Sequence, residues 1–321
     1  MLKTEITELL GIQYPIIGGT MMSITDADFT AAIANAGGLG ILASAIYQSK
    51  EAFREGLDRV LALTDHPFGV NLNLFPMMRP IDNNDYLDAL LEKGVKIVET
   101  SGHSAPEDLC KRFKESGLIW IHKCVGVRYA LKVQDMGADV VTVVGYENGG
   151  ATGKLDIGTM VLVPRVVESL NIPVIGGGGV SDGRGLAAML ALGAHGAIIG
   201  TRLLTTQEAP IHENLKKALV RASELDTMLV MRSIGATHRV WVNRAAKKCA
   251  ELEKEQAELT EILKVAAGDN ARKMYAEGDL DMGILPCGQG IGLVHDLPTV
   301  QELFQKIMED AEGVIQGLAA G

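Results

Sequence analysis

Two glycine-rich segments have the composition of a phosphate-binding site. The first reads Val174-Ile-Gly-Gly-Gly-Gly-Val-Ser-Asp-Gly-Arg-Gly185, and the second reads Ala197-Ile-Ile-Gly-Thr-Arg202. Each begins as an apolar run typical of a β-strand, changes to glycine where backbone could approach a ligand, and is followed by a helical pattern. Backbone N–H groups at such junctions bind phosphate, although the glycines could instead serve close packing of a helix on a strand. The expected donors are the backbone N–H groups of Gly178, Gly179, Gly200 and Thr201, with the Thr201 hydroxyl as a further donor.

The surrounding chain alternates strand-like and helical patterns, which is typical of a parallel sheet built from βα units. Helix starts are marked by capping residues such as Ser49 and Asp182. Eight such units predict an α/β fold, a (β/α)8 TIM barrel whose site lies at the carboxyl ends of the strands. An open dinucleotide-binding sheet would need GxGxxG after its first strand. This chain has Gly18-Gly-Thr-Met-Met22 there, which lacks that glycine spacing. The expected strands are Tyr14–Gly18, Leu39–Ala43, Phe68–Leu72, Val95–Thr100, Leu118–Lys123, Val140–Val144, Val174–Gly177 and Gly196–Gly200.

The pattern changes after the eighth strand. We expect residues 1–209 to form the barrel and residues 210–281 to form a smaller all-α domain, because this second stretch reads as helical and strandless. Such a domain could cover the substrate as a lid, or it could only pack or dimerise. Residues 282–321 then read as a turn-rich return segment followed by an amphipathic helix from Pro298 onward, which would pack on the barrel.

Composition limits the classes of function. The chain has 321 residues, 47% of them hydrophobic, and a formal charge of −10, so a large core is expected and a general nucleic-acid or anionic-membrane binder is disfavoured. Its first residues lack a basic and continuously apolar leader, and its four cysteines lack CxxC spacing. We therefore expect a cytoplasmic protein with a small-molecule substrate and no metal. A homodimer is compatible with the sequence, which does not fix the oligomeric state.

Several segments, in chain order, resemble the FMN-dependent nitronate monooxygenase family, which includes the flavin-dependent enoyl-ACP reductase and a branch of NADH:quinone reductases. The resemblance covers nearly the whole chain. It implies an enzyme, an FMN-dependent oxidoreductase with NAD(P)H as co-substrate. The matching segments are Pro15-Ile-Ile-Gly-Gly-Thr-Met21, Ala34-Asn-Ala-Gly-Gly-Leu-Gly40, Pro67-Phe-Gly-Val-Asn-Leu72, Ile121-His-Lys-Cys124, Gly176–Gly185, Gly200-Thr-Arg202 and Gly278–Gly290.

The resemblance also implies which residues bind the cofactor. Lys123 would stabilise the negative charge that develops on the reduced flavin ring, although the same lysine could simply form an ion pair at the barrel mouth. Asn71 would reach the polar edge of the ring, or it could cap strand ends. The full set implied for FMN is Gly19, Thr20, Met21, Asn71, Lys123, Gly149, Gly150, Gly177, Gly178, Gly179, Gly200 and Thr201.

One loop departs from the family pattern. Relatives have Gly-Gly-His-x-Gly after the sixth strand, with the histidine over the flavin as acid or base, and this chain has Ala151 at that position. A methyl group moves no proton, so deprotonation of a neutral nitroalkane by this route is unsupported. Candidate substitutes are His103, Glu147, Tyr146 and Thr152, although His103 could instead cap a helix and Glu147 could fix loop hydrogen bonds.

The resemblance and the departure together favour NAD(P)H-dependent reduction of a quinone or an activated C=C bond. Two alternatives remain. The first is oxidation of preformed alkyl nitronates with O2, which needs no base. The second is a non-catalytic barrel that binds FMN or another phosphate ligand. His122 is expected to face away from Lys123 and to be structural, because neighbouring residues of a strand point to opposite faces.

Overall fold

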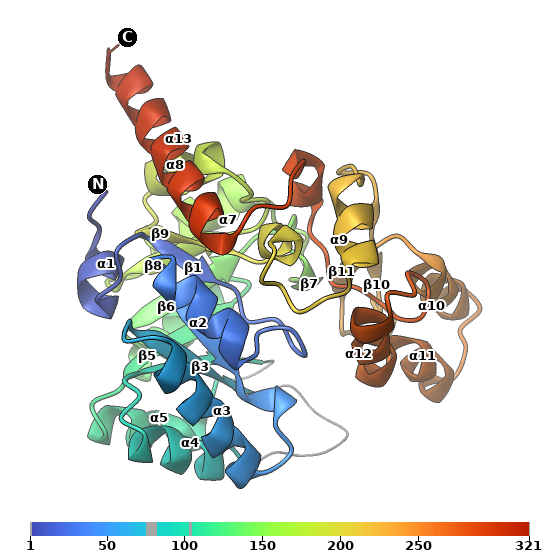
Figure 1. Ribbon diagram of the computed structural model, residues 1–321, viewed down its shortest axis with the longest axis horizontal. Helices are drawn as coiled ribbons and strands as arrows, with labels where there is room; N and C mark the ends of the chain where they lie inside the picture. Colours follow the sequence, from blue (N-terminus) through green and yellow to red (C-terminus); the bar gives the residue numbers. More distant parts are fainter. Residues whose placement is uncertain (1, 75–81, 103–104, 321) are drawn as a thin grey trace.

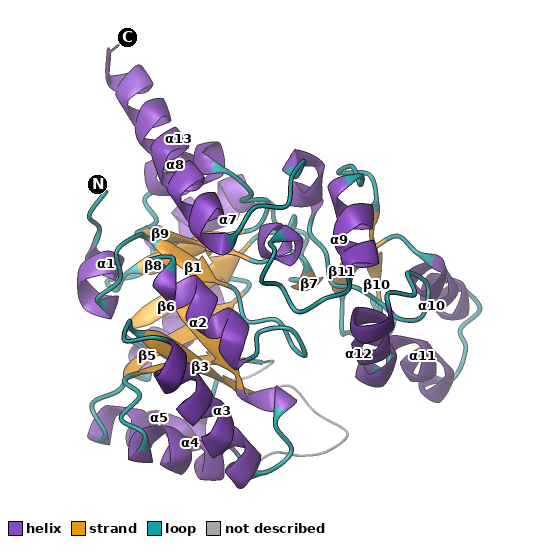
Figure 2. Cartoon of the chain, in the orientation of Figure 1, coloured by secondary structure: helices purple, strands orange, loops and turns teal. Residues whose placement is uncertain are grey.

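The computed structural model describes residues 2–74, 82–102 and 105–320. Eight parallel strands form one sheet in the order β1-β9-β8-β6-β5-β4-β3-β2 (Figures 1 and 2). A parallel bridge between Ile17 and Leu39 joins the two end strands, so the sheet closes into a barrel. All eight expected strands are confirmed. Their bounds are β1 Ile16–Gly18, β2 Gly40–Ala43, β3 Phe68–Asn73, β4 Ile97–Ser101, β5 Ile119–Cys124, β6 Val140–Val144, β8 Val174–Gly177 and β9 Gly196–Ile199.

Helices cover the outside of the barrel, and their starts follow the capping residues of the sequence. The Ser49 side chain accepts a hydrogen bond from the Ala52 N–H, and Asp182 accepts one from the Gly185 N–H. Both caps confirm the sequence-based expectation. These barrel helices are α2 Ala27–Asn35, η1 Ser44–Ile46, α3 Lys50–Leu63, α4 Asn83–Glu92, α5 Glu107–Glu115, α6 Val127–Asp135, α7 Thr159–Val167, α8 Gly183–Ala191 and the 3-10 helix η2 Thr201–Thr205.

Two apolar clusters hold the barrel together. The larger one lies between the strands and the outer helices, and the smaller one fills the barrel interior with residues such as Ile97, Ile121 and Ile198. The short helix α1 (Glu5–Leu10) adds Ile6 and Leu10 to this inner cluster. The interior is therefore a packed core, as in other barrels of this type, and a ligand must bind at its mouth.

Residues 210–281 are not all helical, which corrects one expectation. They contain β10 (Thr227–Val230) and β11 (His238–Trp241), which pair antiparallel, and β11 also pairs with β7 (Gly150–Ala151). Each strand has only four residues, too short for a clear alternating pattern. The helices α9 (Glu213–Val220), α10 (Arg244–Lys254), α11 (Leu259–Ala266) and α12 (Gly268–Glu277) complete this part of the chain.

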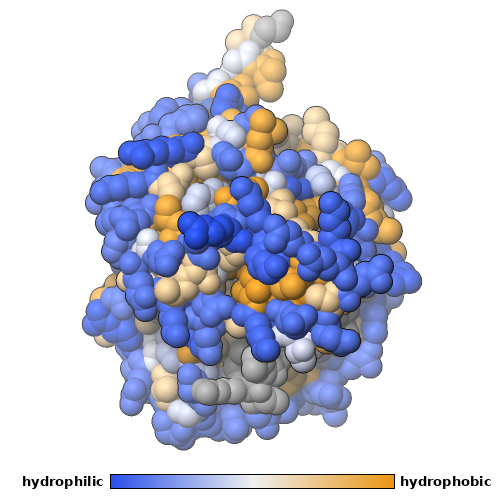
Figure 3. Space-filling view, turned by 90° about the vertical axis from the view of Figure 1, so that its right-hand side faces the viewer, coloured by the Kyte–Doolittle hydropathy of each residue, from blue (hydrophilic) through white to orange (hydrophobic). Residues whose placement is uncertain are grey.

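This smaller lobe has its own apolar cluster, and its outer side is mainly hydrophilic. Val230, Val240 and Cys249 belong to that cluster. Charged and polar residues dominate the side that carries α10 to α12, with smaller hydrophobic areas between them (Figure 3). Pairing of β11 with β7 joins the lobe to the barrel loop that follows β6.

The chain then returns to the barrel. A segment containing the 3-10 helix η3 (Gln289–Leu293) leads to α13 (Val300–Ala320), which packs along α8 and also contacts α2 (Figure 1). This confirms the expected C-terminal helix. Within the described residues, no helix has the length and apolar character needed to cross a membrane.

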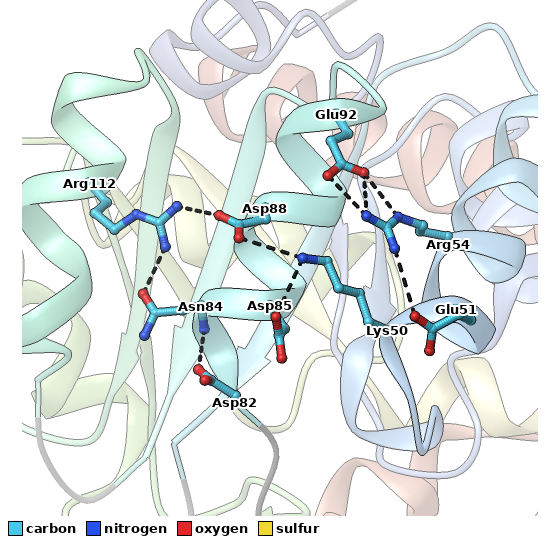
Figure 4. A network of polar contacts seen from close by, with 9 residues as sticks. All are labelled: Lys50, Glu51, Arg54, Asp82, Asn84, Asp85, Asp88, Glu92 and Arg112. Atoms are coloured by element: carbon cyan, nitrogen blue, oxygen red, sulfur yellow. Dashed lines mark hydrogen bonds and ion pairs between the residues drawn. The ribbon is translucent and has the colours of Figure 1, made fainter.

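Ion pairs link the helices α3, α4 and α5, which lie on the side of the barrel opposite α13 (Figure 1). Arg54 of α3 contacts Glu92 of α4 at 2.7 Å, and Arg112 of α5 contacts Asp88 of α4 at 2.5 Å (Figure 4). Lys50 adds contacts to Asp88, so α3, α4 and α5 form one continuous charged network. Because the partners are partly exposed, each pair contributes at most about 1 kcal/mol to stability.

Candidate active site

A pocket with about 600 Å³ of empty space lies at the carboxyl ends of β1, β5, β6, β8 and β9. Seven of the 18 lining residues are glycines, and Lys123 and Glu147 are the charged ones among them. The residues are Gly19, Thr20, Met21, Lys123, Val144, Glu147, Asn148, Gly149, Gly178, Gly179, Val180, Ser181, Ile198, Gly200, Thr201, Pro286, Gly288 and Gly290.

Part of this pocket is lined by a glycine cradle, which consists of Gly178, Gly179, Gly200 and Thr201. Among the residues that the structure describes, none accepts a hydrogen bond from the backbone N–H groups of Gly178, Gly179, Gly200 and Thr201. Gly179 has a positive φ of 77°, which favours glycine. Unpaired N–H groups at the ends of the last two barrel strands are suited to an anion such as phosphate.

The return segment forms a wall of the pocket that sequence reasoning did not include in the site. The backbone N–H of Gly288 donates to the Thr201 hydroxyl oxygen at 2.8 Å, and the Ser181 hydroxyl donates to the Gly290 carbonyl at 2.8 Å. The Thr201 hydroxyl thus accepts one bond from the protein and keeps its own hydrogen for a ligand. The glycines of Cys287-Gly-Gln-Gly290 were the sequence signal for a close backbone approach here. A side chain at Gly288 would come within 2.6 Å of the Glu147 carbonyl oxygen.

A buried arginine fastens this wall to the barrel. Arg202 of η2 pairs with Asp296, and its guanidinium also donates to the Thr205 hydroxyl at 2.7 Å. Burial lowers the pKa of Arg202, and the charge of Asp296 opposes that effect. The expected Gly-Thr-Arg motif therefore has two functions, because Gly200 and Thr201 line the pocket and Arg202 holds its wall.

A polar layer lies beneath another part of the pocket. Lys123, near the end of β5, lines the pocket together with Thr20. The Thr20 hydroxyl donates to Glu99 Oε1 at 3.0 Å, and the Asn71 amide donates to the same oxygen at 2.6 Å. Asn71 and Glu99 do not line the pocket themselves, and Thr20 connects them to it. Sequence reasoning missed Glu99, although a charged residue inside the apolar strand Val95–Thr100 was a visible signal.

Glu147 has a structural role in addition to its place in the pocket. Its carboxylate accepts hydrogen bonds from the Thr159 N–H at 3.0 Å and from the Thr159 hydroxyl at 2.6 Å. Thr159 is the first residue of α7, so Glu147 caps that helix, whose N-cap residue Gly158 has no side chain to do so. The carboxylate is thereby fixed beside Gly178 and Gly179.

Ala151, where the sequence resemblance implies the histidine of relatives, lies on β7. It pairs with His238 of the antiparallel strand β11, so the two side chains lie on the same face of that small sheet. His238 Nδ1 lies 2.7 Å from the Ala236 carbonyl. A carbonyl only accepts, so this contact places a proton on Nδ1, and Nε2 carries the lone pair in the neutral ring.

The remaining site candidates have different locations. His103 lies outside the described residues. Gly150 and Gly177 do not line the pocket; a side chain on Gly177 would come within 2.3 Å of Ile198, so this glycine serves strand packing. His122 is 3% exposed and lies 2.7 Å from the Thr100 hydroxyl, and burial lowers its pKa to about 4. Its structural role is therefore confirmed.

The chain forms a closed (β/α)8 barrel, and the anion cradle after its last two strands lies in the same pocket as Lys123. These features are typical of α/β-barrel enzymes. The model of the nitronate monooxygenase family matches residues 3–310, and the chain belongs to that family. It is an oxidoreductase, as its named relatives are.

Three relatives show the breadth of the family. The chain is 33% identical to a (3aS,4S,5R,7aS)-5-hydroxy-7a-methyl-1-oxo-octahydro-1H-indene-4-carboxyl-CoA dehydrogenase from Rhodococcus jostii, over 99% of this chain and 98% of the relative. It is 30% identical to a probable nitronate monooxygenase from Staphylococcus saprophyticus, over 85% and 90%. The structure of FabK from Thermotoga maritima matches with a TM-score of 0.92 and 32% identity, over 100% and 99%.

Proposed function

We propose that the protein is an FMN-dependent reductase that transfers hydride from NAD(P)H to a quinone or to an activated C=C bond. The observation that carries this proposal is the pocket itself, which is lined both by an anion cradle with unpaired N–H groups after β8 and β9 and by Lys123 of β5, a strand that β6 separates from β8. This arrangement suits a ligand with a phosphate and a polar ring. FMN is such a ligand, and bound FMN supplies hydride transfer chemistry at its ring nitrogen N5.

The residues of the chain fit this cofactor. The N–H groups at Gly178, Gly179 and Gly200, with Thr201, would bind the phosphate. A side chain on Gly200 would meet only the Met21 sulfur, at 4.0 Å, so the space beside this glycine is open to a ligand. Gly19, Thr20 and Met21 would contact the ring, and the Lys123 ammonium would stabilise negative charge on it.

Reduction of a C=C bond also needs a proton, and Ala151 cannot supply it. Glu147 lines the pocket but is fixed by Thr159, so we propose that His238 relays the proton by taking one from solvent and passing it to the substrate. His238 lies opposite Ala151 on the same face of the small sheet, and the Ala236 carbonyl holds its ring orientation. It therefore offers an imidazole beside Ala151, the position at which the family resemblance implies a histidine.

The relatives support carbon or quinone substrates. The Rhodococcus jostii relative, which covers nearly the whole chain, is named a dehydrogenase of a carboxyl-CoA compound. Such a name describes hydride chemistry at carbon, consistent with a site without the family histidine. We therefore favour α,β-unsaturated carbonyl compounds and quinones as oxidising substrates.

A second candidate function is oxidation of preformed alkyl nitronates with O2. The match to the nitronate monooxygenase family favours it, and a nitronate is already ionised, so Ala151 would not prevent this reaction. A third possibility is a barrel that binds FMN without turnover. The experiment below would reveal it if neither NAD(P)H nor a nitronate reduces the flavin.

Anaerobic flavin reduction separates these functions. The purified protein is loaded with FMN and mixed, in separate experiments, with NADH, NADPH and a preformed nitronate, and flavin absorbance is followed. The proposal expects bleaching by NADH or NADPH within seconds to minutes and reoxidation on adding a quinone or an enone. Bleaching by the nitronate alone would instead establish the second function, and no bleaching by any donor over hours would show an inert binder.

A further inference from the structure

A carboxyl group is buried directly beneath the pocket. Glu99 lies on β4, two residues after Ile97 of the inner apolar cluster, so both side chains point into the barrel. Strand register pairs Glu99 with Asn71 of β3 and places Lys123 of β5 opposite Ser101. Glu99 is 1% exposed and therefore belongs to the polar layer that separates the pocket from the apolar interior.

The two oxygens of this carboxyl have different surroundings. Oε1 accepts hydrogen bonds from Thr20 and Asn71. Oε2 is buried and has no hydrogen-bond partner among the described residues. Two neutral donors on one oxygen do not compensate a buried charge, because each such bond contributes only about 1 kcal/mol net.

Lys123 is the cation that acts on this group. Burial raises the pKa of Glu99, and the positive charge of Lys123 is the largest influence that opposes the rise, ahead of the hydrogen bonds from Thr20 and Asn71. Lys123 also lines the pocket. Because charges in a poorly solvated interior interact strongly, the Glu99 carboxyl offsets part of the field that Lys123 exerts on a bound ligand.

We propose that Glu99 stays ionised beside Lys123 and is a positioning residue that acts through this lysine, making reduction of the bound flavin less favourable than Lys123 alone would. This inference rests on the proposed FMN function. Reduction adds negative charge to a ring beside Lys123, and a carboxylate behind the lysine opposes that charge. A less easily reduced flavin gives up its hydride more readily, as a reductase of C=C bonds requires.

The test compares the affinities for oxidised and reduced FMN, together with the reduction potential, in the wild type and in Glu99→Gln. The amide oxygen of glutamine can still accept from Thr20 and Asn71, so the change removes the charge and keeps the hydrogen bonds. We expect reduced FMN to gain at least tenfold in affinity relative to oxidised FMN, which raises the potential by about 30 mV for two electrons. An unchanged or lowered potential overturns the proposal.

Three further variants separate charge from packing. Glu99→Asp keeps the carboxylate and should change the affinity ratio less than threefold, and Glu99→Met removes the charge if the glutamine variant does not fold. Asp139→Asn changes a carboxylate that accepts a hydrogen bond from Trp120 N–H at the amino end of β6, and it should leave the potential unchanged. An equal shift in this control would overturn a specific role of Glu99.

Coupling to Lys123 is tested by repeating the glutamine substitution in Lys123→Met. If Glu99 acts through the lysine, its effect on the affinity ratio should fall at least threefold in that background; an undiminished effect overturns this part of the proposal. None of these measurements needs NAD(P)H or an organic substrate. Failure of the wild type to bind FMN would refute the proposed function and is distinguishable from an unaltered potential.

Discussion

Gly200 offers a direct test of the phosphate cradle. Its φ of −130° suits any residue, and an added Cβ would meet only the Met21 sulfur at 4.0 Å. Alanine at this position should therefore leave the fold intact, and the free energy of unfolding of the apoprotein should change by no more than about 1 kcal/mol. The new methyl group would instead occupy the pocket.

The substitution Gly200→Ala is expected to weaken FMN binding. A methyl at Gly200 moves a phosphate oxygen away from the adjacent N–H, and loss of one hydrogen bond to a charged group costs about 1.5–3 kcal/mol. This corresponds to a rise of roughly 10- to 150-fold in the Kd for FMN. The assay is titration of FMN fluorescence with the deflavinated Gly200→Ala protein, combined with urea unfolding of the same preparation.

Two other glycines serve as comparisons for this prediction. Gly313→Ala adds a methyl in open space on α13, so it should keep the Kd and gain up to about 1 kcal/mol in stability. Gly178→Ala should lower stability by about 1–3 kcal/mol, because its φ is +103° and its Cβ would come within 2.5 Å of the Thr159 hydroxyl. An unchanged Kd in Gly200→Ala would refute the placement of the phosphate between β8 and β9.

Three other variants test the charges and protons around the barrel. His122→Gln should lose less stability on acidification than the wild type. Because the folded pKa of His122 is lowered to about 4, the unfolded chain binds the proton first as pH falls through 6.5. Urea unfolding should show that this group costs the wild type about 3 kcal/mol of its free energy of unfolding between pH 6.5 and 4. Ala151→His should raise turnover of neutral nitroalkanes by about 100-fold or more in an oxygen-consumption assay; no gain would show that position 151 does not reach the substrate. His238→Gln should lower kcat for enone reduction by about 100-fold and remove an inflection from its pH profile, with an unchanged Kd for FMN; an unaltered kcat would exclude the proton role.

The barrel could be predicted well from the sequence because each strand is a short apolar run followed by a strong helical pattern. The cradle glycines were equally visible, since their spacing after the last two strands is a local property of the chain. Glu99 was not predicted, because its importance comes from contacts with Thr20 and Asn71, which lie far from it in sequence. The strands β10 and β11 were not predicted for a related reason. Each has only four residues and so shows little periodicity, and the pairing of β10 with β11 and of β11 with β7 depends on tertiary structure.

The wall formed by the return segment has a consequence for biosynthesis. All eight barrel strands are complete once residue 199 has been made, yet Gly288, Gly290 and Asp296 reach the cradle only after the smaller lobe has been synthesised. Domains tend to fold in order of synthesis, so a nascent barrel would present an open, half-walled cradle to the cell. Ribosome-bound chains that stop before residue 286 should therefore retain FMN poorly, and cofactor loading becomes a late event that follows completion of the chain.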